Sequence, residues 1–142
     1  MEFREIQENE LEAVGMIADK SFDDYSKEDY FKMAHDNNYR FIVSVLENKV
    51  VGFVIFLRID DKIEIIKIAT DPIFRRRGIA SGLLNFVKKF AENNGHCGAI
   101  LEVNEKNLPA RSLYRKIGFN EIHIRKKYYH NTDDAIIMEW NK

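Results

Sequence analysis

Three arginines stand directly before a glycine in "RRRGIASGLL", residues 75–84, and the run then turns apolar. A positive loop that opens a helix can bind an anion, because the N–H groups of the first turn lack partners within the helix and the helix dipole adds partial positive charge. Gly78 has no Cβ and Ala80 adds only a methyl group, so an anion could approach the backbone closely. The same run is also compatible with a solvated helix start, where charged runs usually lie.

The spacing of this run excludes two phosphate-binding loops. A Walker loop requires G-x-x-x-x-G-K-[ST], and the Lys-Ser/Thr pair is missing. A dinucleotide-binding fingerprint requires G-x-G-x-x-G near the start of a strand–helix–strand unit. The pattern that is present is R-x-x-G-x-A, from Arg75 to Ala80.

Glu102 is a candidate general base, because it interrupts the apolar stretch "AILEV", residues 99–103. Strand alternation places Glu102 on the face of Ile100, opposite Leu101 and Val103. A carboxylate within an apolar strand is costly unless it is paired or functional, and desolvation makes it a stronger base. The alternative is a glutamate near the strand end that reaches solvent.

Tyr114 is a candidate general acid, in the stretch "ARSLYRKIGF". Its phenol can donate a proton or a hydrogen bond to a leaving group. Helical spacing places Ala110 and Tyr114 close together on one face. A tyrosine that only packs against the core is the alternative.

Cys97 is the one cysteine of the chain, which rules out an internal disulfide and a cysteine metal cluster. The four histidines show no ligand spacing, so we expect no metal site. No histidine motif surrounds Cys97 at its predicted strand start. We therefore interpret it as a small buried hydrophobic residue and not as a catalytic nucleophile.

The overall charge points to no nucleic-acid or membrane partner, since 22 Lys and Arg residues balance 23 Asp and Glu residues to a formal net charge of −1. The apolar run at residues 50–57 is far too short to span a bilayer. The charged start "MEFREIQENE" is unlike a signal peptide. These features favour a cytoplasmic protein.

The periodicity predicts the elements that hold these residues. We expect strands at residues 2–6, 39–46, 50–59, 63–70, 97–103, 119–125 and 135–140. We expect helices after a capping box from Asn9 to Glu12, after Ser26, from Ile79 to Asn94, and from Pro109 to Gly118. The first helix would carry the apolar residues Leu11, Val14, Met16, Ile17 and Phe22. This order, β-α-α-β-β-β-α-β-α-β-β, predicts a mixed α/β sheet covered by helices in one domain of 142 residues.

The stretch "IATDPIFRRRGIASGLL" resembles the acetyl-coenzyme A signature of the GCN5-related N-acetyltransferase superfamily, a strand, a [Q/R]-x-x-G-x-[G/A] loop and a helix. The element order resembles that α/β fold over essentially the whole chain, with a mostly antiparallel seven-stranded sheet and about four helices. The resemblance implies acetyl-coenzyme A as cosubstrate, with its pyrophosphate on backbone N–H groups. That role would fall on Arg76, Arg77, Gly78, Ile79, Ala80 and Ser81, while Ile68, Ala69 and Thr70 would run beside the pantetheine arm.

A second superfamily pattern, N-x-x-A-x-x-L-Y-x-x-x-G-F, is matched by Asn107, Ala110, Leu113, Tyr114, Gly118 and Phe119. It implies that Asn107 contacts the cofactor near the pantetheine and that Tyr114 is the acid. "LEV" with the following Asn resembles the base region of N-terminal acetyltransferases, which implies Glu102 as the base. A backbone N–H around Ala69 and Thr70 would polarise the thioester carbonyl.

The tail "GFNEIHIRKKYYHNTDDAIIM" resembles the C-terminal region of bacterial ribosomal-protein-alanine N-acetyltransferases. In related enzymes, tyrosines before the last strand hold the substrate backbone, which implies substrate contacts for Tyr128 and Tyr129. Two tyrosines that pack at a strand end are the alternative.

The resemblance therefore implies acetylation of the N-terminal α-amine of a protein, in particular a ribosomal protein that begins with alanine. An α-amine has a pKa of about 8 and a lysine about 10.4, so a modest base suffices for the α-amine. Two alternatives stay open. One is an acetyltransferase for small-molecule amines or lysines with the same cofactor loop, and the other is a coenzyme A-sensing or protein-binding module without turnover.

Overall fold

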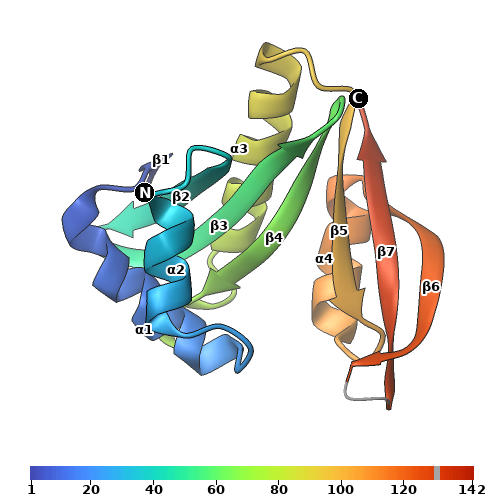
Figure 1. The fold of residues 1–142 in the computed structure, drawn as a ribbon, viewed down its shortest axis with the longest axis horizontal. Helices are drawn as coiled ribbons and strands as arrows, with labels where there is room; N and C mark the ends of the chain where they lie inside the picture. Colours follow the sequence, from blue (N-terminus) through green and yellow to red (C-terminus); the bar gives the residue numbers. More distant parts are fainter. Residues whose placement is uncertain (130–131) are drawn as a thin grey trace.

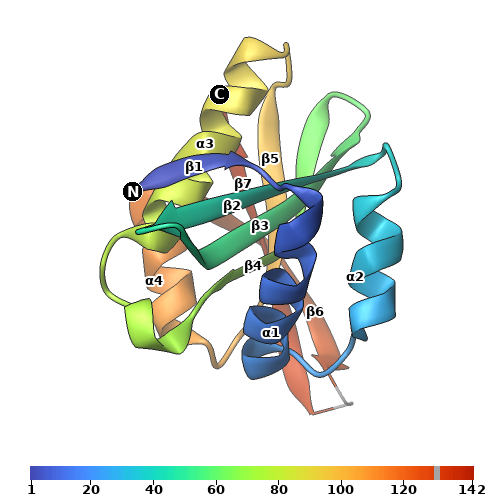
Figure 2. The ribbon, with the colours of Figure 1, turned by 90° about the vertical axis from the view of Figure 1, so that its left-hand side faces the viewer.

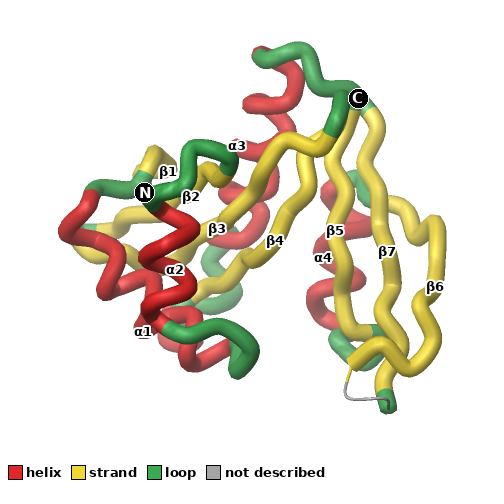
Figure 3. The backbone as a smooth tube through the Cα atoms, in the orientation of Figure 1, coloured by secondary structure: helices red, strands yellow, loops and turns green. Residues whose placement is uncertain are grey.

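The computed structural model describes residues 1–129 and 132–142, and of Tyr129 only the backbone. Seven strands form one sheet in the order β1-β2-β3-β4-β5-β7-β6 (Figures 1 and 3). Its neighbours pair antiparallel except β4 and β5, which are parallel. The expected mixed, mostly antiparallel α/β sheet is confirmed. The strands are β1 (Glu2–Glu5), β2 (Tyr39–Leu46), β3 (Lys49–Ile59), β4 (Lys62–Thr70), β5 (Gly98–Asn104), β6 (Asn120–Tyr129) and β7 (Asp133–Asn141).

Helices cover both faces of the sheet, with α1 and α2 on one face and α3 on the other (Figure 2). Leu83 and Leu84 of α3 share a buried cluster with Tyr114 of α4. Val14 of α1 and Tyr30 of α2 belong to a second cluster on the opposite face. The helices are α1 (Leu11–Ser21), α2 (Lys27–Ala34), α3 (Ile79–Asn93) and α4 (Leu108–Ile117), and short 3-10 turns lie at η1 (Glu8–Glu10) and η2 (Pro72–Phe74).

Two predicted helix ends are confirmed. Ser26 caps α2, since its Oγ accepts from the N–H of Asp29 at 3.1 Å and the Asp29 carboxylate accepts from the N–H of Ser26 at 2.8 Å. Gly95 follows α3 with φ 74°, a left-handed conformation that glycine adopts without strain.

The predicted capping box at Asn9 and Glu12 is wrong. The chain turns earlier, where the Glu10 carboxylate accepts from the N–H of Gln7 at 2.8 Å and pairs with Arg4 at 2.8 Å. Arg4 lies on β1, so a contact between two elements overrides the local capping signal. Helix α1 therefore begins at Leu11 after the η1 turn.

The side chains of Met16 and Cys97 lie outside the core. Met16 is 52% exposed, because the buried face of α1 is formed by Val14, Gly15, Ile17 and Ala18. Cys97 is exposed and not buried, since it precedes β5 and its N–H donates to the Asp61 carbonyl at 2.8 Å. Within the described residues, no helix is long and apolar enough to cross a membrane.

Candidate active site

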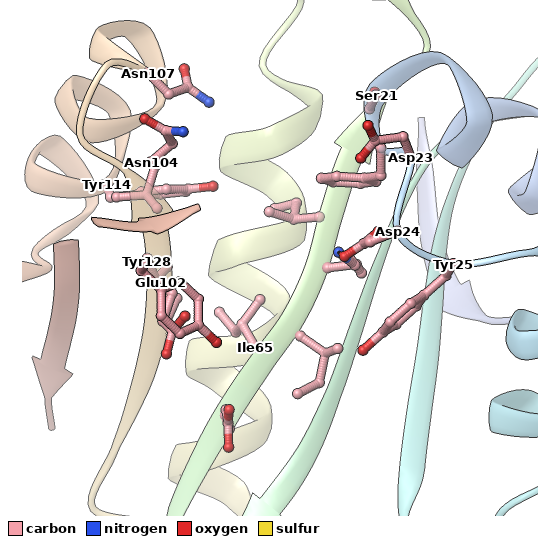
Figure 4. Close-up of a pocket in the computed structure, with 17 residues that line it drawn as sticks. Ser21, Asp23, Asp24, Tyr25, Ile65, Glu102, Asn104, Asn107, Tyr114 and Tyr128 are labelled. Atoms are coloured by element: carbon pink, nitrogen blue, oxygen red, sulfur yellow. Dashed lines mark hydrogen bonds and ion pairs between the residues drawn. The ribbon is translucent and has the colours of Figure 1, made fainter. Parts of the chain in front are cut away.

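The sheet opens between β4 and β5. These parallel strands pair only where Lys62, Ile63 and Glu64 meet residues 98–100. Beyond that point β4 stays with β3 and β5 stays with β7, so the carboxyl ends of β4 and β5 diverge (Figure 1). A cleft of about 860 Å³ lies in the opening, with walls from β4, β5, α4, β6 and the segment between α1 and α2 (Figure 4).

Glu102 lines this cleft from β5. Leu101 and Val103 are buried on the opposite face, so the predicted strand alternation is confirmed. The Glu102 side chain is 30% exposed and pairs with Arg125 of β6, whose Nη1 lies 2.8 Å from Oε1. The Glu102 carboxylate is thus partly exposed to solvent and paired with a guanidinium.

Tyr114 and Asn107 reach the cleft from α4. Tyr114 is 8% exposed, its ring packs beside Phe119 at 6.2 Å between centroids, and its hydroxyl points toward the middle of the cleft (Figure 4). Asn107 caps α4, because its side-chain oxygen accepts from the N–H of Ala110 at 3.3 Å.

The end of α4 explains the rest of the N-x-x-A-x-x-L-Y-x-x-x-G-F pattern. Gly118 takes a left-handed φ of 113°, and the N–H of Phe119 donates to the carbonyl of Tyr114 at 2.9 Å. The motif therefore caps both ends of a helix that presents Tyr114 to the cleft.

The arginine-rich loop leads into α3 through a left-handed glycine. Gly78 is the N-cap with φ 77°, no side chain caps the helix there, and a Cβ at Gly78 would meet nothing within 4 Å. Arg76 is also left-handed, with φ 66°. The space beside Gly78 at the first turn of α3 is thus open, whereas the Ile79 side chain is buried in the core.

The other predicted cofactor residues follow one another along β4. Ile68 lines the cleft. Ala69 is buried in the second core cluster, and Thr70 is half-buried at the carboxyl end of the strand. Asp71 then begins the turn toward the arginine-rich loop, its carboxylate accepting from the N–H of Ile73 at 3.2 Å.

A β-bulge interrupts β4 inside the cleft. Ile55 of β3 pairs with Lys67 and Phe56 with Ile65, which leaves Ile66 as an extra residue without a partner in register. Ala69 and Thr70, where we expect the N–H that polarises the thioester carbonyl, pair regularly with β3. The irregular backbone of β4 is therefore at Ile66, which lines the cleft.

The wall opposite Glu102 comes from residues 21–25, which sequence analysis did not identify (Figure 4). Asp24 forms an ion pair with Lys67 of β4. Burial, with the nearby Asp24 charge as a smaller cause, raises the pKa of Tyr25, so this phenol stays protonated at neutral pH. The signal in the sequence is Lys67 itself, a charge within the apolar run "IIKIA".

Tyr128 lies on β6, is 51% exposed and lines the cleft beside Glu102. The guanidinium of Arg125 lies 5.5 Å from its ring centroid. The predicted role of Tyr129 concerns a side chain outside the described residues, although its backbone pairs with Asp133. Residues 1–129 and 132–142 contain no group of three or more His, Cys, Asp or Glu side chains that could hold a metal ion.

Known proteins similar to this chain carry the same fold. A solved structure of the ribosomal-protein-S18-alanine N-acetyltransferase from Escherichia coli superposes with a TM-score of 0.90 at 28% identity, over 99% of this chain and 92% of that one. The [Ribosomal protein bS18]-alanine N-acetyltransferase of Escherichia coli K12 is 39% identical over 93 residues, which span 63% of each chain. An N-alpha-acetyltransferase of Saccharolobus solfataricus is 33% identical over 124 residues, 77% of this chain and 74% of that protein.

The match to a family extends over most of the cleft lining and over the arginine-rich loop. The model of the acetyltransferase (GNAT) family matches residues 2–119, from β1 to the end of α4. This range includes the arginine-rich loop, Glu102 and Tyr114, and it covers most of the chain. The chain therefore belongs to the acetyltransferase (GNAT) family.

Proposed function

We propose that this protein transfers an acetyl group from acetyl-coenzyme A to the N-terminal α-amine of a protein. One observation carries the proposal: Glu102, Tyr114 and Tyr128, from three different elements, line a single cleft. A base for the acceptor amine and an acid for the leaving thiolate are two of the groups that amine acetylation uses, and an exposed aromatic side chain beside them can contact a peptide.

The cofactor would lie between α3 and the open edge of β4. Residues 76–81 would hold the pyrophosphate through backbone N–H groups, in the open space beside Gly78. Ile68, Ala69 and Thr70 would lie along the pantetheine arm, with Asn107 of α4 across from them. Bound acetyl-coenzyme A supplies the acetyl group as a thioester.

Glu102 would accept a proton from the acceptor ammonium. The ion pair with Arg125 holds the carboxylate in one orientation at the cleft wall. Tyr114 would donate a proton to the departing thiolate, because its hydroxyl points into the same cleft (Figure 4). The backbone at the Ile66 bulge would supply the N–H that polarises the carbonyl, and this is the irregular point of β4 in the cleft.

The acceptor we favour is the N-terminal alanine of a ribosomal protein. Support comes from the named activity of the Escherichia coli relative and from the related activity of the Saccharolobus protein. Tyr128 would contact the acceptor backbone at the exposed mouth of the cleft, and we place Tyr129 in the same role.

Three acceptors separate this proposal from its alternatives. The first is a peptide that begins with alanine, the second is the same peptide with a blocked α-amine and an internal lysine, and the third is a polyamine. Mass spectrometry after incubation with acetyl-coenzyme A should find acetylation on the α-amine of the first peptide only. Acetylation of the lysine or polyamine without any α-amine product would contradict the proposal. Coenzyme A binding without transfer to any acceptor would identify a binding module.

A further inference from the structure

Lys67 is a nearly buried lysine in the wall of the cleft. Its side chain is 12% exposed, and it forms an ion pair with Asp24. Its ammonium lies 4.4 Å from the ring centroid of Phe22 and 4.7 Å from that of Tyr25. All three partners belong to residues 22–25, the segment that joins α1 to α2.

The bulge at Ile66 gives Lys67 this orientation. Ile65 and Ile68 pack in the cluster on the α3 and α4 face, whereas Ile66 packs in the cluster on the α1 and α2 face. Regular alternation would send Lys67 to the face of Ile65. Because the bulge adds one residue, Ile66 and Lys67 lie in succession on the same face, and Lys67 reaches the segment between α1 and α2.

We infer that Lys67 is a positioning residue for the acceptor, because it fixes residues 22–25 as the cleft wall opposite Glu102 and Tyr128. The inference rests on the proposed function. Other contacts hold the two ends of this segment: the N–H of Phe22 donates to the Ala18 carbonyl at 2.8 Å, and the Tyr25 ring meets Tyr30 at 5.7 Å next to the Ser26 cap of α2. Without the ammonium, the acceptor would have to order this wall as it binds, which weakens binding.

The central experiment compares Lys67→Met with Lys67→Arg. Methionine keeps an unbranched apolar stem without the charge, whereas arginine keeps the ion pair and both ring contacts. We expect Lys67→Met to raise KM for an alanine-initiated peptide about five- to tenfold, a scale typical of a lost cation–π and ion-pair contact. KM for acetyl-coenzyme A and kcat should stay within about twofold of wild type, and Lys67→Arg should restore most of the peptide affinity.

Lys62→Met is the matched control. Lys62 lies on the same strand and forms an ion pair with Glu139, but it is outside the cleft lining. The Lys62→Met substitution should leave KM for the peptide unchanged. Asp24→Asn tests the ion pair with Lys67 from the exposed partner. The double variant Asp24→Asn with Lys67→Met should have the same peptide KM as Lys67→Met alone, because both substitutions break the same interaction.

Hydrogen exchange gives a readout that does not depend on turnover. The amides of residues 22–25 should exchange faster in Lys67→Met than in wild type, while those of β3 stay unchanged. Unchanged exchange in this segment would overturn the inference, as would an active Lys67→Met enzyme with a wild-type peptide KM. A wild-type protein that acetylates no peptide would instead refute the proposed function, and the exchange data would still decide whether Lys67 orders the segment.

Discussion

Arg125 reaches across β7 from the edge strand β6 to place its Nη1 2.8 Å from Oε1 of Glu102 on β5. The same guanidinium lies 5.5 Å from the ring centroid of Tyr128. One cation therefore links the candidate base to the candidate acceptor contact. Because Glu102 is partly exposed, the ion pair, and not burial alone, orients its carboxylate in the cleft.

Glu102→Gln removes the base while keeping nearly the same shape. We expect kcat to fall by about 10²- to 10⁴-fold near pH 7, the usual contribution of a general base. The loss should shrink as pH rises toward and above the α-amine pKa of about 8, because the amine then deprotonates without help. Steady-state rates with an alanine-initiated peptide from pH 6.5 to 9.5 test this profile.

Glu64→Gln is the control for this change, since Glu64 contributes another carboxylate to the same cleft. It should change kcat by less than about threefold if the effect is specific to Glu102. Equal rates for Glu102→Gln and wild type at every pH would exclude Glu102 as the base.

Tyr114→Phe keeps the ring against Phe119 and removes only the hydroxyl. If that hydroxyl protonates the leaving thiolate, kcat should fall by about 10²-fold. The affinity for coenzyme A, measured by calorimetry, should stay within about threefold, because the ring still fills the same place. A large loss of affinity with little change in kcat would make Tyr114 a pocket residue and not the acid.

The fold and much of the cleft were predictable, because the deciding signals are local. Alternation in "AILEV" predicts the faces of Glu102 and its neighbours, and Gly118 predicts the end of α4, whereas the cap that Asn107 forms was not predicted. The loop pattern predicts that Gly78 leaves room at the start of α3, whereas its left-handed φ was not predicted. Each of these features depends on residues within one or two turns of chain.

The features that escaped prediction depend on contacts between distant segments. The Arg125–Glu102 pair crosses the intervening strand β7, and the Lys67 contact joins β4 to the segment after α1. The divergence of β4 from β5 has no marker in either strand. The Ile66 bulge does leave a trace, since apolar residues at 65 and 66 break the alternation of "IEIIKIAT".

His96 makes folding stability depend on pH. It is 5% exposed and stacks on Phe90 at 6.1 Å, and burial lowers its pKa below the ordinary value of about 6.5. As pH falls, His96 therefore binds a proton more readily in the unfolded chain than in the folded protein. The stabilisation of the fold by neutral His96 is complete above a pH of about 6.5 and is lost as pH falls below that value. In urea unfolding, the free energy of unfolding should fall less between pH 8 and pH 5.5 for His96→Gln than for wild type.

His35 acts in the opposite direction, so only the difference between wild type and His96→Gln isolates His96. A hydrogen bond to the Phe31 carbonyl, with a smaller effect of Glu8, raises the pKa of His35, and its charged form stabilises the fold at low pH. That stability is lost as pH rises through the raised pKa. His35→Gln should consequently lose more stability than wild type over the same acid step, and equal losses for all three proteins would contradict both assignments.

Gly78→Ala tests the cofactor loop, and the chain offers a matched control at the other end of α3. Gly78 and Gly95 are both left-handed, with φ 77° and 74°, and a Cβ at either would meet nothing within 4 Å. Alanine should therefore cost each site about 1 kcal/mol of folding stability, through backbone strain alone.

Only the methyl at Gly78 would enter the space proposed for the pyrophosphate. We expect calorimetry to show coenzyme A affinity at least about tenfold weaker for Gly78→Ala, a loss of about 1.4 kcal/mol, and unchanged for Gly95→Ala. Equal affinities in the two variants would place the pyrophosphate elsewhere and remove the basis for assigning residues 76–81 to the cofactor.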